Sequence, residues 1–284
     1  MIDEDFVLSE EQIINYFDRL EMIYDKDKWK PSEENLRILQ NVHIAKIPYE
    51  NLSILMKEPI SLNGNDLYNK IIVEHRGGYC FEVNGLFTHL LKALGYQVTV
   101  YNCRFIYEDQ GVQVRRHRIM KVDFKHASYI TDVSFRNESP RFPLKFVCDE
   151  VQWDGIAEYK FTKDDYYGYV MWQKLDGEDW KMIFGFDESP QSETDFFLPN
   201  YFCETHPQSP FIDEPHMSIC PANEHITIAG RKIVMSKKNI IVEKNTIHSR
   251  EEFCLLCKKY FGIAIDIKKA EIIMSNEDLT NDDI

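Results

Sequence analysis

The sequence lacks three features that would assign it to a common class of protein. It has no apolar run near the roughly 18 residues that a membrane helix needs, and its first five residues are acidic rather than basic and then apolar as in a signal peptide. No cluster of Lys and Arg interrupts the net charge of -14, which comes from 33 basic and 47 acidic residues. We therefore expect no membrane and no nucleic acid as partner, although an anionic small molecule is compatible with a local basic spot.

Further absences concern cofactors and redox chemistry. No glycine fingerprint follows a predicted strand, which disfavours a nucleotide-dependent dehydrogenase, and no internal repeat or low-complexity segment is present. The seven cysteines are odd in number and scattered, so with no export signal we expect reduced thiols in a cytoplasm. Cys254 and Cys257 form one C-x-x-C pair without a second pair or matching histidines, so we expect no metal there and place both on a helix.

The segments that are present follow an order typical of an α+β fold. Apolar residues at helical spacing predict helices over 10–20 and 33–44, and a third helix that starts at Cys80 or Phe81 and is stopped by Gly95. Ile13, Ile14, Phe17 and Leu20 are expected on the buried face of the first. Runs rich in Val, Ile, Tyr and Phe then predict strands over 97–105, 117–124, 128–135, 158–161, 166–173 and 180–186. A linker over 200–221, a hairpin around Gly230, a helix over 250–260 and a frayed end from 276 complete the prediction.

The stretch Arg-Gly-Gly-Tyr-Cys-Phe-Glu, residues 76–82, is the most informative in the sequence. Its two glycines allow a sharp turn and a close approach to a substrate. Cys80 then lies where the first N–H groups of a helix are unpaired, and these groups favour a thiolate. The Cys80 N–H also suits one arm of an oxyanion hole. The alternative is an ordinary loop followed by a cysteine that packs as a small apolar residue.

A thiol nucleophile needs a histidine base and a third group that orients the histidine. His117 opens one predicted strand and Asp132 lies in the next. If the two strands form a hairpin, one register places Asp132 opposite Met120, on the other face from His117, and a slip by one places it opposite Ile119, on the same face as His117. The triad requires the second register or a bulge. Taken alone, a histidine at a strand start is more often an ordinary polar residue with its hydrogen bonds satisfied, and Asp132 is compatible with a simple bond to a backbone amide.

Several motifs together resemble the arylamine N-acetyltransferases, enzymes that use acetyl-coenzyme A. The matching stretches are Tyr16-Phe17-Asp18-Arg19-Leu20, His43 followed by Ile47-Pro48-Tyr49-Glu50-Asn51-Leu52 with Tyr49 in place of a phenylalanine, Arg76-Gly77-Gly78 with Cys80 and Glu82, and Thr205-His206-Pro207 with Ser209-Pro210-Phe211. Cys80, His117 and Asp132 fall where that family has its nucleophile, base and orienting aspartate. The resemblance implies that these three residues are catalytic.

The same resemblance implies the fold and the reaction. The fold would be a helical domain over 1–95 that carries the nucleophile, a β-barrel domain over 96–210 that carries His117 and Asp132, and an α/β lid over 211–284, around a Cys-His-Asp core like that of cysteine proteases. The reaction would move an acetyl or short acyl group from acyl-coenzyme A to an arylamine, arylhydrazine or related amine through a thioester on Cys80, with ping-pong kinetics.

The resemblance also suggests binding residues, with one departure from the family. The family has a glycine-containing run after its aspartate, where coenzyme A approaches the backbone, whereas here Ser134, Phe135 and Arg136 follow. Arg136 would contact a phosphate or narrow the site. We expect Phe105, Ser134, Phe135 and Arg136 on the coenzyme A side and Tyr79, Phe135 and Phe211 around the acceptor, although these aromatic residues are also typical of a core. A cysteine hydrolase or transglutaminase-like enzyme and a non-catalytic binding protein of the same fold are the alternatives.

Overall fold

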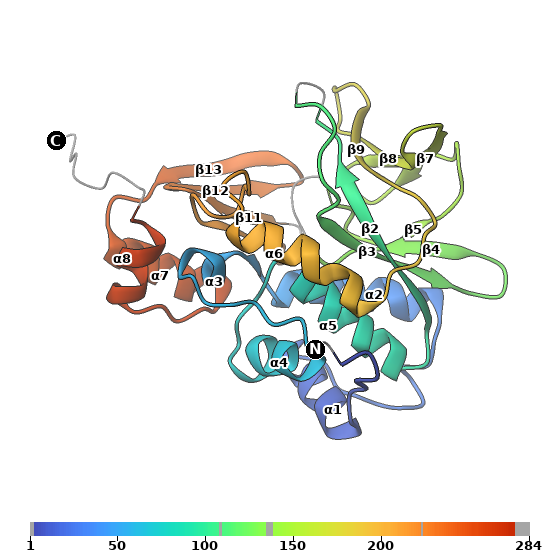
Figure 1. Cartoon of the computed structure of the whole chain (residues 1–284), viewed down its shortest axis with the longest axis horizontal. Coiled ribbons are helices and arrows are strands. Elements are labelled where there is room, and N and C mark those ends of the chain that lie inside the picture. Colours follow the sequence, from blue (N-terminus) through green and yellow to red (C-terminus); the bar gives the residue numbers. More distant parts are fainter. Residues whose placement is uncertain (1–2, 108–109, 135–138, 223, 276–284) are drawn as a thin grey trace.

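The computed structural model describes residues 3–107, 110–134, 139–222 and 224–275. Helices come first along the chain, as predicted, and Figure 1 shows them below the two sheets. They are α1 (Glu10–Arg19), α2 (Glu33–Lys46), α3 (Leu52–Leu55), α4 (Gly64–Tyr68), the π-helical turn η1 (Asn69–Val73) and α5 (Cys80–Ala93). The helix that begins at Cys80 is therefore not the third, because two short helices precede it that the apolar periodicity did not reveal.

The buried face of α1 differs in one residue from the predicted face. Ile13 and Phe17 are buried as expected, but Ile14 is 42% exposed and Tyr16 is fully buried in its place. Residues three, four and seven positions apart share a helix face, so a stripe that starts at Ile13 includes Tyr16 and turns Ile14 to its edge. Ser9 caps the helix by accepting a hydrogen bond from the Gln12 N–H.

The middle of the chain forms an eight-stranded antiparallel sheet that curves into a nearly closed barrel (Figure 1). The sheet has the order β5-β4-β3-β2-β9-β8-β7-β6. Its strands are β2 (Gln97–Phe105), β3 (His117–Asp123), β4 (Ser128–Thr131), β5 (Leu144–Lys145), β6 (Gln152–Trp153), β7 (Glu158–Asp164), β8 (Gly168–Lys174) and β9 (Lys181–Phe186). The predicted strand over 128–135 is shorter in the structure: β4 stops at Thr131, so Asp132 lies just beyond the strand rather than within it.

The predicted linker over 200–221 is wrong, because a helix and a strand lie within it. These are α6 (Phe197–Thr205), preceded by a 3-10 turn η2 (Glu193–Phe196), and β10 (His216–Ile219). Pro199 made this stretch resemble a loop in the sequence. In the structure it lies in the first turn of α6, where a missing N–H breaks no hydrogen bond within the helix.

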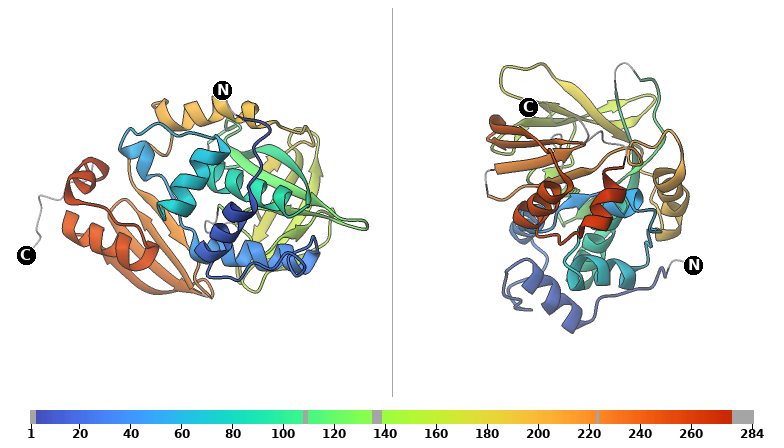
Figure 2. Two further views of the ribbon diagram at one scale, coloured as in Figure 1. Left: turned by 90° about the horizontal axis from the view of Figure 1, so that it is seen from below. Right: turned by 90° about the vertical axis from the view of Figure 1, so that its left-hand side faces the viewer.

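The C-terminal part is a second antiparallel sheet with two helices. The sheet runs β1-β10-β11-β12-β13, so β1 (Tyr49–Glu50), from the helical region, pairs with β10. The other elements are β11 (Glu224–Ala229), β12 (Lys232–Lys237), β13 (Ile240–Thr246), α7 (Arg250–Phe261) and α8 (Ile267–Ile273). The hairpin around Gly230 is confirmed, with Gly230 at φ +55°. Figure 2 shows this sheet and the barrel at opposite ends of the molecule, with α5 between them.

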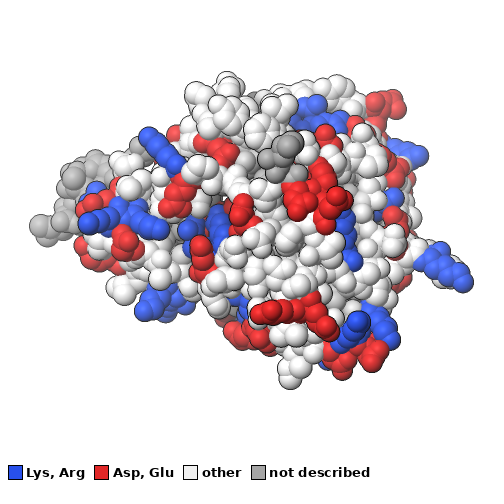
Figure 3. Space-filling view, turned by 60° about the horizontal axis from the view of Figure 1, so that its bottom comes forward, with Lys and Arg blue, Asp and Glu red and all other residues white. Residues whose placement is uncertain are grey.

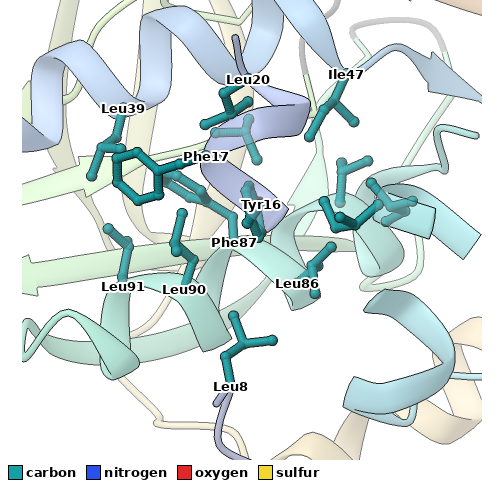
Figure 4. Packing of buried hydrophobic residues seen from close by; sticks show 14 of the residues in the cluster. Leu8, Tyr16, Phe17, Leu20, Leu39, Ile47, Leu86, Phe87, Leu90 and Leu91 are labelled. Carbon is teal, nitrogen blue, oxygen red and sulfur yellow. The ribbon is translucent and has the colours of Figure 1, made fainter. Parts of the chain in front are cut away.

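The largest apolar core surrounds α5. From Cys80 to Leu91 every residue of α5 is buried, and Figure 4 shows Leu86, Phe87, Leu90 and Leu91 of this helix beside Phe17 and Tyr16 of α1. Burial of this kind contributes about 1.5–3 kcal/mol for each large apolar side chain. The helix that carries Cys80 is therefore fixed on all sides, which holds its first residue in one place.

No helix among the described residues is long and apolar enough to cross a membrane. On the face drawn in Figure 3, acidic and basic side chains are interspersed. The strong negative charge of the sequence is thus spread over the surface in that view rather than gathered into one patch.

Candidate active site

The two glycines before Cys80 allow the chain to lie against another strand. A Cβ atom on Gly77 would come within 2.0 Å of the Pro48 carbonyl oxygen. Gly78 forms a parallel bridge with Tyr49, at the start of β1. The glycines therefore allow a close approach between two backbone segments, a role that the sequence analysis did not foresee.

The start of α5 is held by a buried carboxylate. Glu82 accepts a hydrogen bond of 3.1 Å from the Tyr79 N–H and is paired at 2.6 Å with Lys70. Burial raises the pKa of Glu82 above its usual value, and the Lys70 ammonium opposes this effect. Cys80 is the first residue of the helix, as predicted, where backbone N–H groups lack partners within the helix.

The hairpin of β3 and β4 adopts the register that a triad requires. Met120 is opposite Thr131, and one more step along the ladder brings Asp132 level with Ile119. The Nε2 atom of His117 lies 2.8 Å from Oδ2 of Asp132, and both residues are buried. Because Nε2 is engaged by Asp132, the Nδ1 atom of His117 is left for the sulfur of Cys80.

The environment shifts the protonation of His117 and of Asp132 in opposite directions. Burial lowers the pKa of His117, but the charge and hydrogen bond of Asp132 and a hydrogen bond with Cys80 outweigh burial and raise the pKa to about 9. Burial raises the pKa of Asp132, but His117 and the donors Ser134 and Asn84 outweigh this and hold it below its usual value. At neutral pH the pair is therefore an imidazolium and a carboxylate.

Asn84, one turn along α5 from Cys80, positions Asp132, and the sequence analysis missed it. Its side-chain N–H₂ group donates to the Arg118 carbonyl at 2.7 Å and to Oδ1 of Asp132 at 2.8 Å, and its oxygen accepts the Val133 N–H at 2.8 Å. The spacing of four residues from Cys80 on one helix face was the available signal.

Ser134 also bonds to the Asp132 carboxylate. Its N–H and its hydroxyl donate to Oδ1 of Asp132 at 2.8 and 2.6 Å. The side chain proposed for the coenzyme A side thus supports the orienting aspartate, while it also lines the cavity of the site.

One cavity brings the candidate residues together. It is lined by Tyr49, Cys80, Phe105, His117, Asp132, Ser134, Ser139, Ile183, Phe184 and Phe211. Of the predicted binding residues, Phe105, Ser134 and Phe211 thus lie at the site, and the Phe105 ring centroid is 4.7 Å from that of His117. Tyr79 is fully buried behind Phe211, with ring centroids 5.5 Å apart and its hydroxyl bonded to Asn200. Phe135 and Arg136 lie outside the described residues.

The remaining cysteines are not in a comparable setting. Burial raises the pKa of Cys103 and of Cys203 well above the usual thiol value, which keeps both neutral. Cys254 and Cys257 lie on α7 as expected. Within the described ranges no group of three or more His, Cys, Asp or Glu side chains is placed to hold a metal ion.

Comparisons with known proteins agree with this geometry. A family model described as N-acetyltransferase matches residues 33–270. A relative from Escherichia coli (strain K12) named arylamine N-acetyltransferase is 27% identical over 242 residues, which cover 83% of this chain and 84% of that protein. A relative from Salmonella typhimurium named arylamine N-acetyltransferase / N-hydroxyarylamine O-acetyltransferase is 28% identical over 243 residues, covering 84% and 85%.

Solved structures give the same result. The structure of arylamine N-acetyltransferase from Salmonella typhimurium matches 95% of this chain and 99% of its own with a TM-score of 0.88 and 25% identity. That of the Mycobacterium marinum arylamine N-acetyltransferase in complex with CoA matches 92% and 98% with a TM-score of 0.85 and 25% identity. The three-part α+β fold expected from the sequence is confirmed, and the chain belongs to the arylamine N-acetyltransferase family.

Proposed function

We propose that this chain transfers an acetyl group from acetyl-coenzyme A to an aromatic amine through a thioester on Cys80. One observation carries the proposal: Cys80, His117 and Asp132 line a single cavity, with Nε2 of His117 bonded to Asp132 at 2.8 Å. Family membership supports the same reaction, because the relatives matched over most of this chain are named arylamine N-acetyltransferases.

In the first half-reaction Cys80 acts as the nucleophile. Its thiolate attacks the thioester carbonyl of the donor, and the Cys80 N–H at the start of α5 is placed to stabilise the oxyanion that forms. As the carbon–sulfur bond to coenzyme A breaks, the His117 imidazolium gives its proton to the leaving sulfur. The products are acetyl-Cys80, neutral His117 and the free coenzyme A thiol.

In the second half-reaction His117 acts as the base. It takes a proton from the amine as the nitrogen attacks the acetyl carbonyl, and Cys80 then leaves as a thiolate. The imidazolium that forms is stabilised by Asp132, and the starting ion pair is restored. Tyr49, Phe105, Phe184 and Phe211 supply the aromatic walls that a flat acceptor needs.

Intact-protein mass spectrometry after incubation with acetyl-coenzyme A tests the proposal. The wild type is expected to gain the mass of one acetyl group and to lose it on addition of an aromatic amine, with the acetylated amine as product. Cys80→Ala should gain no mass. The matched control Cys254→Ala, on α7 and half-buried, should be acetylated like the wild type. A wild type that takes no acyl group from any short acyl-coenzyme A would overturn the proposal.

The same experiment separates the alternatives. A cysteine hydrolase or transglutaminase-like enzyme would turn over peptide amides without coenzyme A, and a binding protein would form no adduct. Three expectations stay predictions: the division into domains at residues 95 and 210, the contact of Arg136 with a phosphate, and a cytoplasmic location. A screen of amines for those that remove the acetyl group from the acetylated enzyme would identify the acceptor.

A further inference from the structure

One arginine beside Cys80 is buried without an acidic partner among the residues that the structure describes. Arg116 directly precedes His117 and is 5% exposed. Its carbonyl oxygen lies 3.6 Å from the Cys80 sulfur. Its guanidinium lies 5.4 Å from the ring centroid of Phe105 and 5.8 Å from that of Phe211, and both rings line the cavity of Cys80. The positive charge of Arg116 therefore lies against the wall of the site.

The neighbouring arginines show how the same fold pairs a guanidinium. Arg118 is fully buried, and its two terminal nitrogens bond to Glu193 at 2.6 and 2.7 Å. Arg115 bonds to Asp187 at 2.5 Å. Arg116 differs from both in that, among the described residues, no carboxylate lies within ion-pair distance of it. Its buried Nη1 atom, like the Nε atom of Arg118, has no hydrogen-bond partner there.

The aromatic contacts stabilise only part of this buried charge. A ring attracts the guanidinium as a cation, but the N–H groups lie in the guanidinium plane and need acceptors of their own. A buried charge without a hydrogen-bonded partner is costly, so proteins rarely keep one without a use. An anionic group of a bound substrate would supply the missing acceptor.

We propose that Arg116 binds a carboxylate carried by a substrate of the Cys80 site, so that the enzyme prefers an anionic donor or acceptor. The inference rests on the proposed acyl transfer. Arginine suits this role because its planar fork matches the two oxygens of a carboxylate. Arg116 also places a positive charge beside the site in a chain whose net charge is -14.

The anionic group that Arg116 would bind is not one of the phosphates of coenzyme A. Those phosphates are separated from the thioester by the whole pantetheine chain, whereas Arg116 contacts rings that line the cavity of the sulfur. Two sources remain for a carboxylate at that place. One is the far end of a dicarboxylic acyl group such as succinyl, and the other is the ring carboxylate of an aromatic amine such as 4-aminobenzoate.

Matched pairs of substrates distinguish the two sources. The donor arm compares succinyl-coenzyme A with acetyl-coenzyme A by the rate of acyl-enzyme formation. The acceptor arm compares 4-aminobenzoate with aniline by kcat/KM at a fixed acetyl-coenzyme A concentration. Each is measured on the wild type, on Arg116→Met and on the control Arg115→Met, whose arginine is paired with Asp187.

Arg116→Met is expected to lower the preference for the anionic member about 10- to 100-fold in one arm, with turnover of the neutral pair changed by a few-fold at most. Arg115→Met should keep the wild-type preference. If Arg116→Met keeps the wild-type preference for the anionic substrate in both arms and still turns over the neutral substrates, the assignment of Arg116 is overturned and the proposed acyl transfer is not. A wild type that turns over no pair refutes the proposed function as well.

A binding measurement keeps the proposal testable if Arg116→Met does not fold. Thermal unfolding of the wild type is followed with benzoate and with its neutral analogue benzamide. The inference requires a larger rise in Tm with benzoate, abolished by Arg116→Gln as a second variant. Equal shifts with the two ligands would count against it.

Discussion

The role of Asp132 can be tested by replacing its carboxylate with an amide of the same shape. In Asp132→Asn the amide oxygen is expected to take the place of Oδ1, because that atom accepts hydrogen bonds from Asn84 and Ser134. The amide N–H₂ group then faces Nε2 of His117. This nitrogen must become an acceptor, and the imidazole proton moves to Nδ1, the wrong side for accepting a proton from a substrate amine.

The loss of charge follows from the same geometry. With Asp132 present the pKa of His117 is raised to about 9, so about 99% of the imidazole is charged at pH 7. Without it, burial dominates and the pKa is expected below 6.5, which leaves less than about a quarter charged at pH 7. Together with the wrong tautomer, this should slow acetylation of Cys80 by about 10²- to 10⁴-fold.

The assay is the time course of acetylation at pH 7 by intact-protein mass spectrometry, with circular dichroism as the check of folding. Asp123→Asn is the matched control, because Asp123 lies at the end of β3, the strand that His117 opens, and accepts a hydrogen bond from Ser128 away from the cavity. It should acetylate at the wild-type rate. A folded Asp132→Asn protein that is acetylated within a few-fold of the wild-type rate would refute the reasoning and assign the orienting role to another residue.

Two further predictions concern stability. The raised pKa of His117 stabilises the folded state fully below pH 6.5, and this contribution is lost as pH rises from 6.5 through about 9. Urea unfolding should therefore show the stability of the wild type falling toward that of Asp132→Asn over this range, and parallel curves would contradict it. Gly77→Ala should destabilise the fold by about 1–3 kcal/mol or more, because the new methyl group would meet the Pro48 carbonyl. Gly177 has a positive φ, +75°, but open space surrounds it. Gly177→Ala should therefore lower the free energy of unfolding by less than Gly77→Ala in the same urea experiment.

The local parts of the fold were predictable because their signals are local. The strand over 97–105 follows from its β-branched and aromatic residues and is present with those bounds. The start of α5 at Cys80 and its stop at Gly95, at φ +92°, follow from two glycines before the helix and one after it. Cys80, His117 and Asp132 could be named as candidates, and the structure brings them to one cavity, because a nucleophile at a helix start limits the choice and because the motifs resemble those of a family.

The register of β3 and β4 could not be decided from the two strands. Both registers fit the alternation of buried and exposed side chains along the two strands. The choice between them depends on Asn84, which is 48 residues from Asp132 in the chain. Its amide group bonds to the Arg118 carbonyl on β3 and to the residues that follow β4, so it favours one register over the other. A contact between distant segments of this kind has no periodic signature in the sequence.

That Arg116 has no acidic partner among the described residues could not be read from the sequence either, because it too depends on contacts between distant segments. The sequence shows three arginines, Arg115, Arg116 and Arg118, around His117, and nothing in their spacing tells which are paired. The fold supplies Asp187 from the end of β9 and Glu193 from η2 to the two outer ones. Arg116 is left facing the rings of the cavity.

The charges of the site explain why an unpaired arginine would matter there. In the proposed mechanism Asp132 keeps its negative charge in both half-reactions, while Cys80 and His117 react as a thiolate and an imidazolium before acylation and are both neutral after it. Without Arg116 the buried charges sum to one negative charge in both states, which would repel an anionic substrate at short range in a medium that screens poorly. With Arg116 the sum is zero throughout the cycle. The arginine therefore removes the penalty on anionic substrates without disturbing the proton transfers, which is why its replacement should alter preference between substrates and leave the reaction of neutral substrates nearly unchanged.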